Sequence, residues 1–315
     1  VGYDLSKETH PNYAKYSQKL EDGWIFGRKV DNSDTQLSEF RDNIPSLALG
    51  LVLYLISSHL FRIFYSSRFP VKLATQPLKR AYFFLGFSAA FLYVLFGNSV
   101  IFIFTILSLN YAISRTFQGS IANPIITWIF NLSVLYLNET YKGYHFKSID
   151  EHLAFLDRNR GLLARWDVNF NISMLRLVSY NMDYYWSFYP PPNSPERNDR
   201  DLAPLTEKDR INTSCYKEDY NFIYYLSYVT YTPLYLAGPI ITYNNFISQL
   251  RYPREITLKD TILYGIRLLL AMLTMEFMLH YIYAVAISNS KAWENDTPFE
   301  LGFIGIFNLL YVWLK

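Results

Sequence analysis

The chain has 315 residues, of which 51% are hydrophobic, 18% aromatic and 18% charged, and its formal net charge is +2. An ordinary soluble domain is about 25% charged, so long apolar runs in such a chain exclude that class and favour a membrane protein. The absence of a basic stripe argues against nucleic-acid binding, and a single cysteine, Cys215, excludes a disulfide framework and a thiolate metal cluster.

The first 80 residues predict an aqueous segment, a membrane span and a cytoplasmic loop. Residues 1–43 are polar, and residues 44–65 form an apolar run of the roughly 20 residues that cross a bilayer. Residues 62–80 carry five Lys or Arg and no acidic residue. By the positive-inside rule this loop faces the cytoplasm, so residues 1–43 should face the lumen.

Further apolar runs follow in chain order. Residues 81–113 are interrupted at Gly97-Asn98 and read as two short spans or as a re-entrant hairpin. The remaining predicted spans are 121–137, 166–186, 221–241, 261–287 and 299–315, and residues 187–220 form an aqueous loop. The expected fold is therefore an all-α multi-pass membrane bundle, with a luminal segment over 1–43 and a membrane-embedded core over 44–315. Because the chain begins with Val1 and ends within or just after a span, we expect the core to be truncated at its C-terminal side.

Two pairs of polar residues lie within predicted spans. Arg176 and Asp183 are seven residues apart, so both lie on one helix face, where they would line a substrate cavity or hold helices in register. Glu276 and His280 are spaced i, i+4. The histidine would be a general base oriented by the carboxylate, or the pair would form a structural hydrogen bond.

The stretch YTPLYLAGPIITYNNF, residues 231–246, interrupts a predicted span. It holds Pro233, Gly238 and Pro239 within seven residues, which disfavours a continuous helix. Irregular backbone at membrane depth is tolerated only where it is buried in protein or lines a wet cavity. The stretch is therefore a cavity wall, or an elbow near the membrane surface.

Four stretches in the same order resemble the glycerol-uptake-protein branch of the membrane-bound O-acyltransferase (MBOAT) family: residues 23–34, 165–183, 228–246 and 275–299. The resemblance implies a helical bundle with broken or re-entrant helices around an internal cavity, in the endoplasmic reticulum membrane or also the plasma membrane. It implies transfer of an acyl group from acyl-CoA, as co-substrate, to a hydroxyl of a lipid, with a glycosylphosphatidylinositol (GPI) anchor lipid as acceptor. No bound cofactor or metal is expected, and the partners are membrane lipids. The residues that match the implied substrate tunnel are Pro233, Gly238, Pro239, Tyr243, Arg176 and Asp183.

The family's catalytic histidine, in a late Trp-His span, has no counterpart among the five histidines of this chain. We expect it to lie beyond Lys315, which predicts that these residues alone are inactive and leaves His280 with Glu276 as the one internal candidate. Two alternatives remain. A glycerol or polyol transporter, or its regulator, would show paired broken helices related by a repeat, which the sequence does not show; a non-catalytic membrane scaffold would need no active site.

Overall fold

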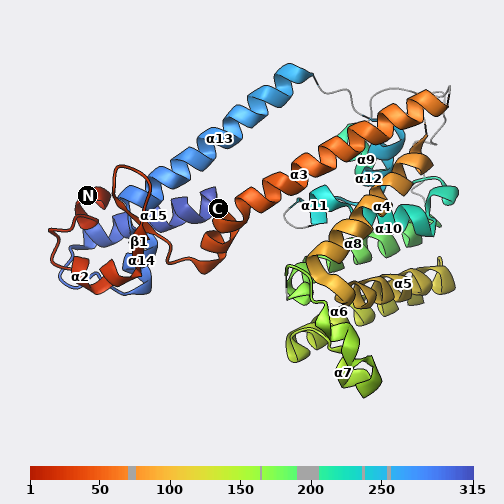
Figure 1. The fold of residues 1–315 in the computed structure, drawn as a ribbon, viewed down its shortest axis with the longest axis horizontal. Coiled ribbons are helices and arrows are strands. Elements are labelled where there is room, and N and C mark those ends of the chain that lie inside the picture. The colour runs from red at the N-terminus through yellow and green to blue at the C-terminus, as the bar shows by residue number, and fades with distance from the viewer. Residues whose placement is uncertain (70–75, 164, 190–205, 236–237, 254–256) are drawn as a thin grey trace. The chain divides into compact units, whose positions relative to one another are not determined.

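The computed structural model describes residues 1–69, 76–163, 165–189, 206–235, 238–253 and 257–315. These residues are mostly helical (Figure 1), which confirms the predicted all-α membrane class. The described strands are β1 (Leu20–Asp22) and β2 (Lys29–Asp31), an antiparallel pair in which Glu21 lies opposite Val30.

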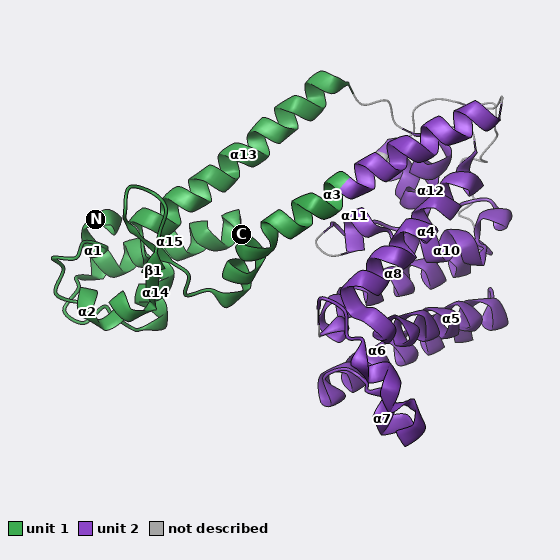
Figure 2. Ribbon diagram, viewed as in Figure 1, with its two compact units in different colours: residues 1–52, 255–315 green, residues 53–254 purple. Residues whose placement is uncertain are grey.

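The chain forms two compact units (Figure 2). Unit 1 comprises residues 1–52 and 255–315, and unit 2 comprises residues 53–254. The predicted luminal segment thus packs with the C-terminal part of the chain, and its luminal location stays a prediction. Helix α3 (Thr35–Arg68) contributes residues to both units.

Unit 1 joins the two ends of the chain. Its other elements are α1 (Gly2–Leu5), α2 (Tyr13–Tyr16), η1 (Ser17–Lys19), α13 (Leu258–Tyr281), α14 (Ala284–Asn289) and α15 (Pro298–Leu314). The start of α15 is fixed by a capping box, in which Thr297 accepts the N–H of Glu300 and the Glu300 carboxylate accepts that of Thr297. Core side chains come from both ends of the sequence, for example Leu5, Tyr16, Leu20, Tyr283, Ile287 and Ile304.

Unit 2 is a helical bundle that contains the long helix α8 (Trp166–Trp186), of whose 21 residues 12 are buried. Its further elements are α4 (Pro77–Phe96), η3 (Gly97–Ser99), α5 (Val100–Phe117), α6 (Ala122–Tyr141), α7 (Phe146–Ile149), η4 (Glu151–Arg158), α9 (Glu207–Asn212), η5 (Lys217–Asp219), α10 (Phe222–Val229), α11 (Thr232–Tyr235) and α12 (Tyr243–Arg251). Helix α8 packs against α5, α6, α10 and α12.

The predicted interruption of residues 81–113 is present at Gly97. This residue has a φ of +55°, and a Cβ there would lie 2.2 Å from the carbonyl oxygen of Asn159. Only glycine tolerates both the left-handed backbone and so close an approach. The turn separates α4 from α5; whether the two helices cross the membrane or re-enter it stays a prediction.

Among the described residues, three helical segments are long and apolar enough to span a membrane: Thr35–Arg68, Pro77–Phe117 and Leu258–Tyr281. Helix α15 is apolar but shorter. The predicted span 221–241 is divided into α10 and α11, as its prolines and glycine indicated. At eight and four residues, neither piece could cross a bilayer by itself.

Candidate functional site around the divided helix

Arg176 holds the backbone at the division between α10 and α11. The residue is 1% exposed, and its guanidinium donates to the carbonyl oxygen of Val229 at 3.2 Å and to that of Leu234. Val229 ends α10, and carbonyls at a helix end lack partners within the helix. A cation at this position also complements the negative end of the helix dipole. Arg176 therefore satisfies the backbone acceptors that the division exposes.

Asp183 holds the beginning of the helix that follows. Its Oδ2 accepts the N–H of Asn244 at 3.0 Å, in the first turn of α12. Ser179, one turn earlier on α8, accepts the N–H of Tyr243 at 3.1 Å. The N-terminal N–H groups of a helix are unpaired donors at its positive end, so a carboxylate and a hydroxyl are suited to them. One face of α8 thus anchors both sides of the irregular stretch.

Within the described chain, no ion pair includes Arg176 or Asp183. Two interpretations of this pair were open, a cavity lining and a structural role. The contacts of Arg176 and Asp183 favour the structural role, because they fix the positions of neighbouring helices. The two residues do so through backbone groups of the divided segment and not by bonding to each other. That they also line a substrate tunnel stays a prediction.

A cluster of buried tyrosines surrounds this site, and sequence reasoning missed it. The rings of Tyr180 and Tyr225 lie 4.5 Å apart, and those of Tyr180 and Tyr243 lie 4.8 Å apart. The hydroxyl of Tyr228 donates to the carbonyl of Ile241 at 2.7 Å, within the irregular stretch. Tyrosine combines a large apolar ring with one donor, so it can fill a core and satisfy irregular backbone together. The only sequence signal was the number of tyrosines, 28.

The other predicted tunnel residues differ in burial. Tyr243 is fully buried, whereas Pro233 and Pro239 are exposed. Gly238 is half-buried, and a Cβ there would lie 2.3 Å from the Cα of Leu234. Two cavities formed by described residues, one beside Trp166 and one beside Arg28, include none of the six predicted residues. The tunnel role of these residues is therefore a prediction that the geometry leaves untested.

A ladder of amides crosses the interior of unit 2. Asn131 of α6 donates to the side-chain oxygen of Asn110 on α5 at 3.1 Å. Asn181 of α8 donates to the hydroxyl of Thr127 on α6 at 2.8 Å and accepts from Asn110 at 3.2 Å. Such bonds between helices stabilise packing in lipid, where apolar side chains gain little from each other. The asparagines within apolar runs were the one feature of the sequence that could have indicated these bonds between helices.

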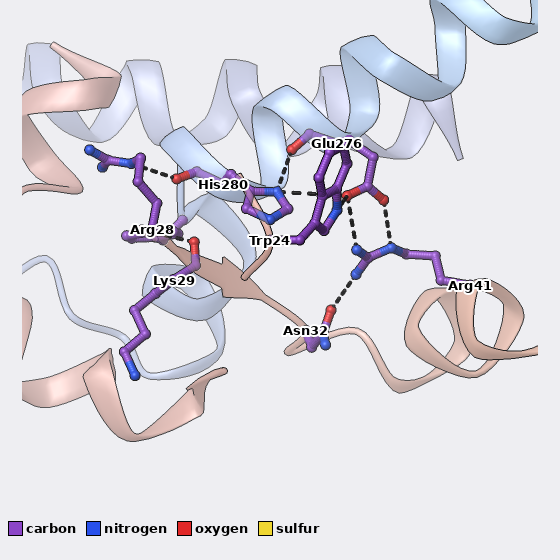
Figure 3. A network of polar contacts seen from close by, with 8 residues as sticks. Trp24, Arg28, Lys29, Asn32, Arg41, Glu276 and His280 are labelled. Carbon is purple, nitrogen blue, oxygen red and sulfur yellow. Dashed lines mark hydrogen bonds and ion pairs between the residues drawn. The ribbon is translucent and has the colours of Figure 1, made fainter. Parts of the chain in front are cut away.

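The second candidate pair, Glu276 and His280, lies in unit 1 (Figure 3). The Glu276 carboxylate accepts the Nε and Nη2 protons of Arg41 at 2.7 and 2.9 Å, and the indole N–H of Trp24 at 3.1 Å. Residues from the beginning of the chain are thereby bound to the last turns of α13. Since the bonds are charge-assisted and the Arg41 contact uses both carboxylate oxygens, this anchor is strong as well as specific.

His280 is 0% exposed. Its Nδ1 lies 2.8 Å from the carbonyl oxygen of Glu276, which can only accept, so Nδ1 carries the proton (Figure 3). Its Nε2 is buried without a partner among the described residues, and a Cβ on Gly23 would lie 2.6 Å from it. The ring is thus enclosed beneath Gly23, and a role for it as a general base stays a prediction. No three His, Cys, Asp or Glu residues in the described ranges are grouped to hold a metal ion.

Comparison with known proteins agrees with the resemblance noted in the sequence. The family model described as MBOAT, membrane-bound O-acyltransferase family, matches residues 126–315. Among curated relatives, the chain is 43% identical to the membrane-bound O-acyltransferase gup1 of Schizosaccharomyces pombe, over 99% of this chain and 54% of that protein. It is 40% identical to the membrane-bound O-acyltransferase GUP1 of Saccharomyces cerevisiae, over 100% of this chain and 56% of that protein. The chain therefore spans about half the length of the curated relatives it matches, and it belongs to the membrane-bound O-acyltransferase family.

Proposed function

We propose that the protein containing this chain transfers a fatty acyl group from acyl-CoA to a hydroxyl group of a membrane lipid. The acceptor that we propose is a lyso form of a GPI-anchor lipid, and the location is the endoplasmic reticulum membrane. The observation that supports the proposal most is the family match over residues 126–315, which includes the divided helix and its anchoring helix α8.

In the reaction, the acyl group moves from the thioester sulfur of acyl-CoA to the hydroxyl oxygen of the acceptor. The acceptor oxygen attacks the thioester carbonyl, a base takes the hydroxyl proton, the carbon–sulfur bond breaks, and CoA leaves as its thiol. Proton transfer by a positioned base contributes roughly 10²–10⁴-fold to such reactions. The resemblance assigns the base to a histidine with no counterpart in these 315 residues. We therefore propose that this chain by itself does not catalyse the transfer.

The contribution of these residues is positioning. Irregular backbone at membrane depth is tolerated only where it is buried in protein or lines a wet cavity, and its polar groups need hydrogen-bond partners there. Arg176, Asp183 and Tyr228 provide those bonds for the divided segment. A rigid arrangement of this kind supplies orientation and excludes bulk water, two established sources of rate enhancement.

The experiment measures transfer of a radiolabelled acyl group from acyl-CoA to lipid, in microsomes that contain the full-length protein and lack the endogenous activity. We expect ester-linked label in GPI-anchor lipid, and loss of that label in a variant without the Trp-His histidine. Label in another lipid class would overturn the proposed acceptor and leave the reaction standing. No label in any lipid, together with saturable glycerol flux in proteoliposomes, would favour the transporter alternative.

A further inference from the structure

A cavity of about 300 Å³ lies within unit 1 and opens at the surface. Its lining includes Tyr3, Lys7, Glu8, Gly27, Arg28 and Lys29. Three of these side chains are cationic and one is anionic. Small-molecule sites measure about 300–1,000 Å³, so this cavity has the size for a compact polar group and not for a long acyl chain.

Arg28 is the cation that lacks a carboxylate. Lys7 and Lys29 are paired with Asp4 at 2.6 Å and Asp22 at 2.5 Å, whereas no ion pair in the described part of the chain includes Arg28. Its Nε donates to the His280 carbonyl at 3.0 Å (Figure 3), and its guanidinium lies 4.5 Å from the centre of the Tyr281 ring. These contacts fix the plane of the guanidinium and leave part of its five N–H donors for an acceptor in the cavity.

The surroundings of Arg28 are suited to an anion. The Lys7 ammonium and the Arg28 guanidinium each lie 5.2 Å from the centre of the Tyr3 ring, so two cationic side chains approach the same aromatic ring. The Tyr3 hydroxyl accepts from Arg28 at 3.4 Å and retains its own proton to donate. A phosphate group, with several acceptor oxygens and one or two negative charges, is complementary to this donor set.

The cavity lies beside the end of a long apolar helix, which favours a membrane lipid as the source of such a phosphate. Tyr281, which stacks against Arg28, is the last residue of α13, a helix long enough to cross the membrane. Lipid head groups lie where such a helix leaves the hydrocarbon, and tyrosines collect at that level. A lipid phosphate would therefore reach this cavity without leaving the bilayer surface.

We propose that this cavity binds the phosphate group of a membrane-lipid head group, with Arg28 as the principal contact and Lys7 and Lys29 as supporting cations. Glu8 lies in the same lining and opposes the anion. The proposal does not depend on acyl transfer, because it concerns unit 1 and a binding equilibrium.

The test is calorimetric titration of the full-length protein in phosphate-free detergent solution. Three probes separate the sources: dihexanoyl phosphatidic acid, glycerol 3-phosphate, and dihexanoylglycerol as the control without phosphate. We expect saturable binding of the first and weaker or no binding of the other two. Lys7→Gln, a change of an exposed side chain, should weaken binding about tenfold, and Arg28→Gln at least as much.

Two further variants control for charge and folding. Glu8→Gln should tighten binding about threefold, an effect that misfolding cannot produce. Lys15→Gln removes a surface cation that pairs with Glu294 outside the cavity and should leave binding unchanged. Equal binding of glycerol 3-phosphate would support the phosphate site and overturn the lipid source. Equal binding of dihexanoylglycerol, or unchanged binding in Lys7→Gln and Arg28→Gln, would overturn the site.

Discussion

Arg176 and Asp183 lie seven residues apart on α8 and bond to opposite sides of one interruption in the helical backbone. Arg176 donates to carbonyls at the end of α10 and in α11, and Asp183 accepts from the first turn of α12. Each charge matches the helix end that it contacts. The cost of burying an arginine and a carboxylate is thereby offset by hydrogen bonds to backbone groups that would otherwise lack partners.

Replacement of Arg176 by leucine should destabilise unit 2. The change removes the donor to the buried carbonyl of Val229 and to the half-buried carbonyl of Leu234, and an unsatisfied buried group costs about 1–3 kcal/mol. We expect the free energy of unfolding to fall by about 2–5 kcal/mol, measured by thermal unfolding of the full-length protein in detergent. Arg158→Leu, at an exposed position of the same unit, is the matched control. Equal unfolding temperatures for the two variants would show that Arg176 does not hold the division.

Gly238→Ala should also be destabilising, because the new methyl group would lie 2.3 Å from the Cα of Leu234. Backbone atoms cannot yield as a flexible side chain can. Gly265→Ala is the control and should raise the unfolding temperature, since nothing lies within 4 Å of a Cβ there and the position is inside α13. Alanine stabilises a helix interior by about 0.5–1 kcal/mol relative to glycine. Unfolding temperatures that change in the same direction would contradict this assignment.

The bond between Arg41 and Glu276 should couple residues that are far apart in the sequence. In a double-mutant cycle of Arg41→Met and Glu276→Gln, we expect a coupling energy of about 1–3 kcal/mol, because the pair is bidentate and mostly buried. Denaturant unfolding of the four proteins supplies the cycle. Additive effects of the two substitutions would mean that the pair does not anchor the beginning of the chain to α13.

The stability of unit 1 should depend on the protonation of Asp31. Burial raises the pKa of this carboxyl above its ordinary 3.8, although N–H groups of Ala286 and Ser33 bond to it and partly counter the shift. The folded state therefore holds the proton more tightly than the unfolded state does. The resulting stability is fully present below pH 3.8 and is lost as the pH rises through the raised folded pKa.

The corresponding measurement compares unfolding temperatures of the parent and Asp31→Asn between pH 4 and pH 7.5. The parent should gain stability relative to the variant as the pH falls. Asp22→Asn is the control, because the hydrogen bond from Lys29 lowers the pKa of exposed Asp22. Relative to Asp22→Asn, the parent should therefore lose stability, not gain it, as the pH falls. Parallel pH profiles for parent and Asp31→Asn would contradict the shift.

The sequence predicted those features that depend on local composition. Apolar runs indicated the helices, and the Gly97 and Gly238 regions indicated where helices are divided, because proline and glycine act on their own backbone. The one-face relation of Arg176 and Asp183 followed from helical periodicity alone.

The contacts between distant segments could not be predicted in this way. The partners of Arg176 are carbonyl groups, which every residue carries and which no residue type marks. The packing of residues 1–52 with residues 255–315 joins segments more than 200 positions apart, and a single sequence holds no pairing signal over that separation. For the same reason the buried tyrosines and the ladder of Asn110 and Asn131 appeared only with the fold.

We propose that the divided segment belongs to the acyl-transfer machinery, and the decisive measurement is the microsomal transfer assay with full-length Gly238→Leu. Acyl transfer per folded molecule should be lost in Gly238→Leu and retained in the Gly265→Ala control, because only the first substitution crowds the backbone that α8 holds in place. Normal transfer by folded Gly238→Leu would show that the division is an elbow without a part in the reaction.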